Sequence, residues 1–275
     1  MTRIWLCADD YGISPSVNAA IRDLVVRGRI NAASVMVVAP SFHRVEALAL
    51  SALNAVAPRV AIGLHLTLTA PYRPLSGGFA PLRDGAFLSL ESSLVRAVLR
   101  SLKSDALAAE IARQICAFVE HFGRAPDFID GHQHVQLFPQ VRDAVLAVAK
   151  REAPDAWVRQ CGRAAAAPRD LGDRKGVLID LLSRGFRRRA AALGVRTNPA
   201  FAGTYAFHGR ADFAAMFPRF LECLPDDSVV MCHPGFVDAE LQRLDPLTTL
   251  REQEYAFFIG DSFPGLLARH GVALA

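Results

Sequence analysis

The sequence predicts an α/β fold with a mainly parallel sheet and helices outside it. Two observations predict this class. Short apolar runs alternate with longer segments of helical periodicity, and ionisable side chains recur where the apolar runs end. About seven strand–helix units suit a closed barrel or an open, doubly wound sheet, and periodicity alone leaves both open.

The first strand and helix carry the clearest local signals. Residues 3–8 form a short apolar run, Ser14 has the position of a helix N-cap, and Pro15 suits the first helical turn. The apolar positions that follow have helical spacing and predict one buried face, made of Val17, Ile21, Leu24 and Val25.

The later elements follow from the same two patterns. The expected strands are residues 34–38, 60–68, 126–135, 156–160, 194–203, 228–235 and 272–274. The expected helices are residues 41–54, 104–122, 139–150, 174–193, 211–221, 249–258 and 263–270. Residues 70–91, rich in Pro and Gly, predict a long loop, and we expect this loop and the 161–175 connection to wall the substrate groove.

Composition limits the class of protein. With 275 residues and 52% hydrophobic content, the chain can build one core, so we expect a single domain over residues 1–275. The net charge is +4, and the main basic cluster, 184–189, is interpreted as a solvated helix face. Aromatic residues do not alternate with arginine in the pattern of a nucleic-acid platform, so we expect no nucleic-acid partner.

We expect a cytoplasmic protein without a transmembrane segment. The apolar stretch after the start is four residues long, too short for a signal peptide, and no apolar run approaches the roughly 18 residues of a membrane span. The five cysteines are scattered without CxxC spacing, which predicts buried free thiols.

Ionisable residues gather at the ends of four expected strands. They are Asp9 and Asp10 after the first, His65 in the third, Asp130, His132 and His134 in the fourth, and His233 in the seventh. In a parallel sheet or barrel these ends meet on one face, so we expect the residues to form one site.

A metal explains the adjacent carboxylates. One Asp with two His suits a divalent cation with open positions for water and substrate. One carboxylate can ligate the cation while its neighbour acts as a base on the attacking water. On a regular strand His132 and His134 would point the same way, so these residues alone leave open which of them ligates.

Four motifs, in order, carry a family resemblance: "ADDYGISPSVN", "GLHLTLT", "IDGHQHVQLFP" and "VMCHPGF". Together they resemble the YdjC-like carbohydrate deacetylases, the ChbG/HpnK group, which is related to the NodB-type polysaccharide deacetylases. The resemblance covers nearly the whole chain. It implies a distorted (β/α) barrel, here seven-stranded, and removal of the acetyl group from N-acetylated sugars such as chitooligosaccharides or a hopanoid-linked glucosamine.

The resemblance also implies residue roles. Asp10, His65 and His132 would be the metal ligands, Asp9 the general base, and His233 the acid or oxyanion partner. The implied metal is Mg²⁺, whereas two histidine ligands favour Zn²⁺, cobalt, nickel or manganese on chemical grounds. The implied partner is an N-acetylated sugar, and the sequence leaves monomer and homodimer open.

Five further residues are expected beside the metal set. His134 would face the substrate or support a ligand, and Asp130 would orient His132 or His233. Gln136 stands where the family often has a histidine, and Thr67 where it often has Asn, which bears on substrate choice. Arg159 would either reach the sugar or form a surface salt bridge.

Three alternatives to deacetylation are considered, two of them enzymatic and one non-catalytic. LamB/YcsF-type proteins, linked to 5-oxoproline cleavage, share the superfamily, but the motifs fit the YdjC-like branch better. Metal phosphoesterases usually begin with HxH on the first strand, where this chain has Asp9 and Asp10. A non-catalytic sugar- or metal-binding barrel would tend to have lost one of the site residues, and all are present.

Overall fold

Parallel strands in one curled sheet form the centre of the protein. The computed structural model describes residues 1–57, 59–167, 174–205, 211–246 and 248–275. Along the sheet the strands are β5 (Trp157–Val158), β4 (Phe128–Gly131), β3 (Ala61–Leu66), β2 (Ala32–Val35), β1 (Thr2–Tyr11), β7 (Ser228–Cys232) and β6 (Phe201–Ala202), with β8 (Val272–Leu274) beside the start of β1.

The sheet is a half-barrel, so the expectation of a distorted, seven-stranded barrel is confirmed in an open form. All strand pairs are parallel, and within the described residues no strand pair joins β5 to β6. The segment that follows β5 nevertheless reaches β6, because the Phe201 amide donates to the Gly162 carbonyl at 3.0 Å.

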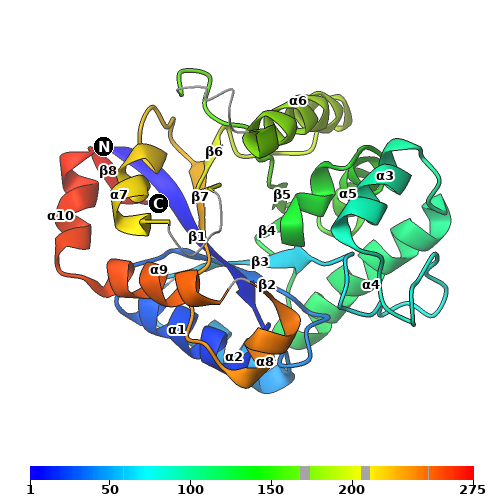
Figure 1. Ribbon diagram of the computed structural model, residues 1–275, viewed down its shortest axis with the longest axis horizontal. Coiled ribbons are helices and arrows are strands. Elements are labelled where there is room, and N and C mark those ends of the chain that lie inside the picture. Colours follow the sequence, from blue (N-terminus) through cyan, green and yellow to red (C-terminus); the bar gives the residue numbers. More distant parts are fainter. Residues whose placement is uncertain (58, 168–173, 206–210, 247) are drawn as a thin grey trace.

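Helices flank the outside of the sheet (Figure 1). They are α1 (Pro15–Val26), α2 (Arg44–Ala52), α3 (Leu90–Val98), α4 (Ser104–Phe122), α5 (Pro139–Glu152), α6 (Arg174–Leu193), α7 (Phe213–Phe220), α8 (Ala239–Leu244), α9 (Thr249–Ile259) and α10 (Ser262–Arg269). The predicted start of α1 is confirmed: the Ser14 hydroxyl accepts from the Val17 amide at 3.3 Å, and Pro15 is the first helical residue.

Four expectations need correction. The short helices α3 and α8 were not expected, and β2 begins two residues before the run at 34–38. The fourth strand ends at Gly131, and the 3-10 helix His132–Leu137 replaces its expected continuation. Of the five cysteines, all free, Cys116 and Cys223 are exposed instead of buried.

Aromatic packing fixes α9 against its neighbours α7 and α10. The Phe217 ring lies 5.1 Å from that of Phe257 and 5.8 Å from that of Phe263, between centroids. Phe258 lies 5.2 Å from Phe263. Such pairs are worth about 0.5–1.5 kcal/mol each beyond burial, so α9 is a firm support for the side chains that it presents.

Candidate active site

Six of the nine predicted site residues line one cavity at the carboxyl ends of β1, β3, β4 and β7, and the other three, Asp130, Gln136 and Arg159, do not. The cavity has a volume of about 280 Å³. It is lined by Asp9, Asp10, His65, Leu90, Gly131, His132, Gln133, His134, Lys175, Met231, His233, Asp245 and Pro246. Ligand sites in parallel α/β sheets lie at this end of the strands, so the cavity is the candidate active site.

The adjacent carboxylates of Asp9 and Asp10 point to different partners because β1 is irregular there. The β1–β2 register shifts between Ala8 and Tyr11, and Asp10 has φ 69°. Asp tolerates this left-handed conformation better than most residues. The local kink directs Asp10 to the histidines and Asp9 to a buried arginine.

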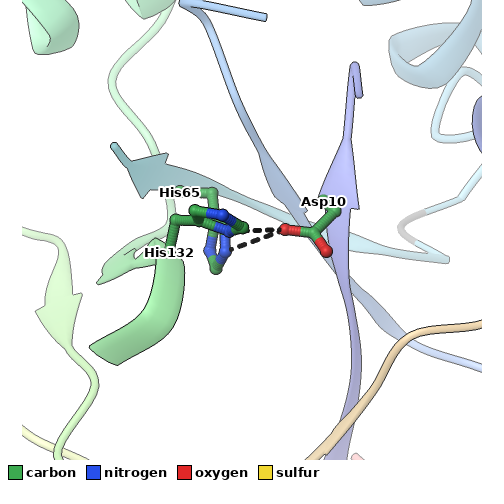
Figure 2. A group of neighbouring side chains, drawn as sticks. All are labelled: Asp10, His65 and His132. Atoms are coloured by element: carbon green, nitrogen blue, oxygen red, sulfur yellow. Dashed lines mark hydrogen bonds and ion pairs between the residues drawn. The ribbon is translucent and has the colours of Figure 1, made fainter. Parts of the chain in front are cut away.

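Asp10, His65 and His132 converge on one point. Oδ1 of Asp10 lies 3.0 Å from Nδ1 of His132 and 3.3 Å from Nε2 of His65 (Figure 2). One possible ligand atom from each residue lies within 4.8 Å of those of the other two, and all three side chains are buried. A divalent cation among them would have one carboxylate oxygen and two imidazole nitrogens as ligands.

Asp130 and Ser34 orient His65. Nδ1 of His65 lies 2.6 Å from Oδ1 of Asp130 and 3.0 Å from the Ser34 hydroxyl, which also donates to Asp130 at 2.5 Å. This arrangement keeps a proton on Nδ1 and leaves Nε2 to face Asp10. The expectation that Asp130 orients His132 or His233 is therefore wrong, and Ser34 was missed.

Arg159 holds Asp9 through both carboxylate oxygens. Its Nη1 lies 2.7 Å from Oδ2 of Asp9, its Nη2 lies 2.8 Å from Oδ1, and Nη2 also lies 2.5 Å from Oδ2 of Asp130. Burial raises the pKa of Asp9, but Arg159 and nearby His65 outweigh burial and lower it to about 2. Because Arg159 is fully buried, a surface salt bridge is excluded, and the residue does not line the cavity.

A second cluster, made of Cys7, Asp9 and Asp130, has metal-like spacing but is already filled. Its possible ligand atoms also lie within 4.8 Å of one another. The Arg159 guanidinium lies among them, and Nη2 contacts the Cys7 sulfur at 3.0 Å. The guanidinium therefore supplies the positive charge that a metal would supply.

His132 and His134 point apart, and His132 is the one that contacts Asp10. The chain leaves the strand at Gly131, and both Gln133 and His134 have positive φ, 55° and 60°. His132 faces Asp10, whereas Nδ1 of His134 lies 3.5 Å from the Cys161 sulfur. Burial, Lys175 and Arg159 lower the pKa of His134 to about 3, so its imidazole is neutral.

Gln136 supports the site from behind. It is fully buried and does not line the cavity. Its amide nitrogen donates to the Arg159 carbonyl at 3.2 Å and lies 3.4 Å from the Cys161 sulfur. The side chain therefore holds the segment after β5 against the turn that carries His132.

His233 follows the end of β7 and lines the same cavity as Asp10, His65 and His132. Burial lowers the pKa of His233 to about 4, with nearby carboxylates opposing the shift only in part. Its backbone amide donates to Oε2 of Glu254 at 2.5 Å, and the Tyr205 hydroxyl donates to Oε1 at 2.5 Å. Burial raises the pKa of Glu254 from its usual 4.5 to about 7.

Sequence reasoning missed two residues that contact the site from α9 and the segment before it. Arg251 is fully buried, and its Nη2 lies 2.6 Å from Oδ2 of Asp10 and 2.8 Å from Oδ2 of Asp245. In this ion-pair network four carboxylates, from Asp9, Asp10, Asp130 and Asp245, face two guanidinium groups. A divalent cation bound beside Asp10 would add positive charge next to these carboxylates.

A family comparison decides the relationship of this chain to known proteins. The model of the family described as "YdjC-like protein" matches residues 3–269. The chain belongs to the YdjC-like family. The match covers almost the whole chain, as the four sequence motifs led us to expect.

Solved structures show the same fold as this YdjC-like chain. A putative cellobiose-phosphate cleavage protein from Enterococcus faecalis is 22% identical, with 100% of this chain and 97% of that chain covered and a TM-score of 0.71. A lactam utilization protein from Thermus thermophilus is 15% identical, with 99% and 98% covered and a TM-score of 0.54.

Among the described residues of this YdjC-like chain, no helix has the length and apolarity needed to span a bilayer.

Proposed function

We propose that the protein is a metal-dependent hydrolase that removes the acetyl group from an N-acetylated amino sugar. The observation that carries the proposal is the convergence of Asp10, His65 and His132 on one point, with Asp9 beside them in the same cavity. The resemblance of the four motifs to carbohydrate deacetylases of the YdjC-like family supports the choice of substrate.

The residues present fit a divalent cation. Asp10, His65 and His132 would hold it, and the orientation of His65 by Asp130 is typical of histidine ligands. Two imidazoles among three ligands suit Zn²⁺, whereas Mg²⁺, the metal that the resemblance implies, prefers oxygen ligands. Metal content and reactivation with each ion distinguish the two.

The role that we propose for Asp9 is to accept the proton of the attacking water. A bound cation would make water more acidic and polarise the acetyl oxygen. Arg159 holds Asp9 ionised, with a pKa of about 2, so the carboxylate is ready to accept a proton but is a weak base. A proton that it receives is therefore passed on readily, and the departing amine is the natural acceptor.

His233 is better suited to hold the oxyanion than to act as a resting acid. Its pKa of about 4 makes the imidazole neutral near pH 7. A neutral ring has one N–H, which can donate to the negative oxygen as the tetrahedral carbon forms. Protonation of the amine by His233 would first require transfer of a proton to the ring.

A second cavity supports a substrate longer than one sugar. It has a volume of about 430 Å³, and its lining includes Cys161, Ile179, Phe201 and Phe220. His134 lines the site cavity and contacts two residues that line the second cavity. Its ring centroid lies 5.6 Å from that of Phe201, edge-on, and its Nδ1 lies 3.5 Å from the Cys161 sulfur. Charged side chains, including Arg163, Asp180 and Arg219, also line this cavity, so its mixed surface suits a further sugar of an oligosaccharide or part of a glycolipid such as a hopanoid conjugate.

Three buried free thiols, on Cys7, Cys161 and Cys232, support a reducing, cytoplasmic environment. This inference about the compartment is independent of the proposed reaction. Fractionation of cells that produce the protein would test it, and recovery outside the cytoplasm would contradict it.

The proposed reaction is tested by acetate release. Purified protein is incubated with N-acetylglucosamine, its β-1,4-linked oligomers and an N-acetylglucosaminyl lipid, and acetate is measured enzymatically. 5-Oxoproline and a phosphate ester serve as substrates of the competing activities. Acetate from at least one sugar supports the proposal, whereas turnover of 5-oxoproline or the ester alone, or of none in a metal-loaded preparation, contradicts it.

A further inference from the structure

Two buried ionisable side chains on α9 face the site, and the proposed reaction uses neither. Arg251 and Glu254 are one helical turn apart, so they lie on the same face of the helix. Both are fully buried. Arg251 contacts Asp10 at the end of β1, and Glu254 accepts from the His233 amide at the end of β7.

Arg251 engages the oxygen of Asp10 that the histidines do not face. Its Nη2 lies 2.6 Å from Oδ2, whereas Oδ1 is the oxygen that faces His132 and His65. In Figure 2 the dashed lines to both histidines start from the same carboxylate oxygen. The guanidinium therefore occupies Oδ2 of Asp10 and leaves Oδ1 to face the site.

The same guanidinium nitrogen lies 2.8 Å from Oδ2 of Asp245, which lines the cavity. Asp245 lies in the segment between α8 and α9, so Arg251 joins the end of β1 to the cavity wall. The aromatic packing of α9 against α7 and α10 fixes the helix that presents Arg251.

We propose that Arg251 is a positioning residue of the metal centre, which makes Asp10 bind the cation through Oδ1 alone. This role rests on the metal site of the proposed function. A carboxylate without such a partner can rotate, or bind through both oxygens, and the coordination number then rises. Outer partners of metal ligands typically change metal affinity by about 10–100-fold when they are removed.

Arginine fits this role better than lysine would. A guanidinium presents several donors in a rigid plane, and one group can serve two carboxylates at once. An ammonium is a compact point charge on a flexible stem, so it would fix the direction of Asp10 less well. Arg251→Lys therefore keeps the charge and removes most of the directional control.

The test is a cobalt(II) titration of the full-length protein, followed by visible absorption and calorimetry. The variants are Arg251→Met and Arg251→Lys. Arg142→Met is the control, because Arg142, although less deeply buried than Arg251, is also paired with a carboxylate, that of Asp143, and lies on α5 outside the lining of the site cavity. Cobalt absorption reports coordination geometry, which a purely structural role of Arg251 would leave unchanged.

We expect Arg251→Met to bind cobalt about 10–100-fold more weakly, with weaker visible absorption as Asp10 becomes bidentate. Arg251→Lys should lose less affinity and show the same change in spectrum, and Arg142→Met should match the wild type. If Arg251→Met does not fold, the cobalt affinity and absorption spectrum of Arg251→Lys decide whether Arg251 positions Asp10. Wild-type affinity or spectrum in the folded Arg251 variants, or tighter binding, overturns this role alone, whereas a wild type that binds no cobalt overturns the metal site as well.

Discussion

Asp9 and Asp10 are neighbours in the chain, yet each is paired with a different buried arginine in a different way. Arg159 bonds to both oxygens of Asp9, whereas Arg251 bonds to one oxygen of Asp10 and the other faces two histidines. The comparison shows that the role of a carboxylate depends on which oxygens its partners occupy. It also explains how the protein keeps two adjacent carboxylates buried without strong repulsion.

Chelation should have the largest effect, because it removes the cation from the Asp10 side and leaves the Asp9–Arg159 pair in place. We expect acetate release to fall to background after dialysis against a chelator. Addition of Zn²⁺ or Mg²⁺ should restore it, and the better ion identifies the metal. Undiminished turnover in a preparation shown by elemental analysis to be metal-free would refute the mechanism.

The variant Asp9→Asn tests the role of Asp9 while Asp10 and its metal site stay unchanged. The amide cannot accept the proton, so we expect kcat to fall by about 10²–10⁴-fold while the metal is retained. Asp143→Asn, at an exposed ion pair on α5, is the control for loss of a carboxylate. Full turnover in Asp9→Asn would remove the residue from the proposed proton transfer.

Arg159→Lys tests whether the guanidinium keeps the pKa of Asp9 low. Lysine cannot bond to both oxygens, so the pKa of Asp9 should rise from about 2 towards its usual 3.8. Because the base must be ionised, the acidic limb of the kcat/KM profile should move to higher pH. An unchanged pH profile in a folded Arg159→Lys variant would contradict the control of the Asp9 pKa by Arg159.

The smallest effect should come from Glu254→Gln, which we expect to change only the pH dependence of the free energy of unfolding. Its pKa is about 7 in the folded protein and about 4.5 when unfolded, so the folded state binds more protons between these values. The free energy of unfolding should therefore decrease as pH rises from about 4.5 to 7. In Glu254→Gln this decrease should be smaller in urea titrations across that range, and an identical slope would contradict the assignment.

The convergence of Asp10, His65 and His132 could be predicted from the sequence, because their positions depend on strand ends. Asp10, His65 and His132 each follow or end an apolar run, and parallel strands bring these ends together. Most helices were also predictable from their periodicity. The short outer strands β5 and β6 were harder to place, because two residues of pairing leave little pattern in the sequence.

Arg251 and Ser34 could not be found in this way. Arg251 lies in a polar stretch, "REQE", that is typical of a solvated helix, and its partner Asp10 is 241 residues away. Ser34 looks like one polar position in an apolar strand. The separation of His132 from His134 depends on two left-handed residues, Gln133 and His134, which ordinary strand periodicity does not predict.

The most direct test of the account is a metal titration of Asp9→Asn and Asp10→Asn side by side, with calorimetry as the measure of binding. We predict that Asp9→Asn binds one equivalent of Zn²⁺ with nearly the affinity of the wild type, and that Asp10→Asn loses more than about 100-fold, beyond the range for outer partners. Retention of full affinity by Asp10→Asn, or equal loss in both variants, would contradict the division of roles between the two carboxylates.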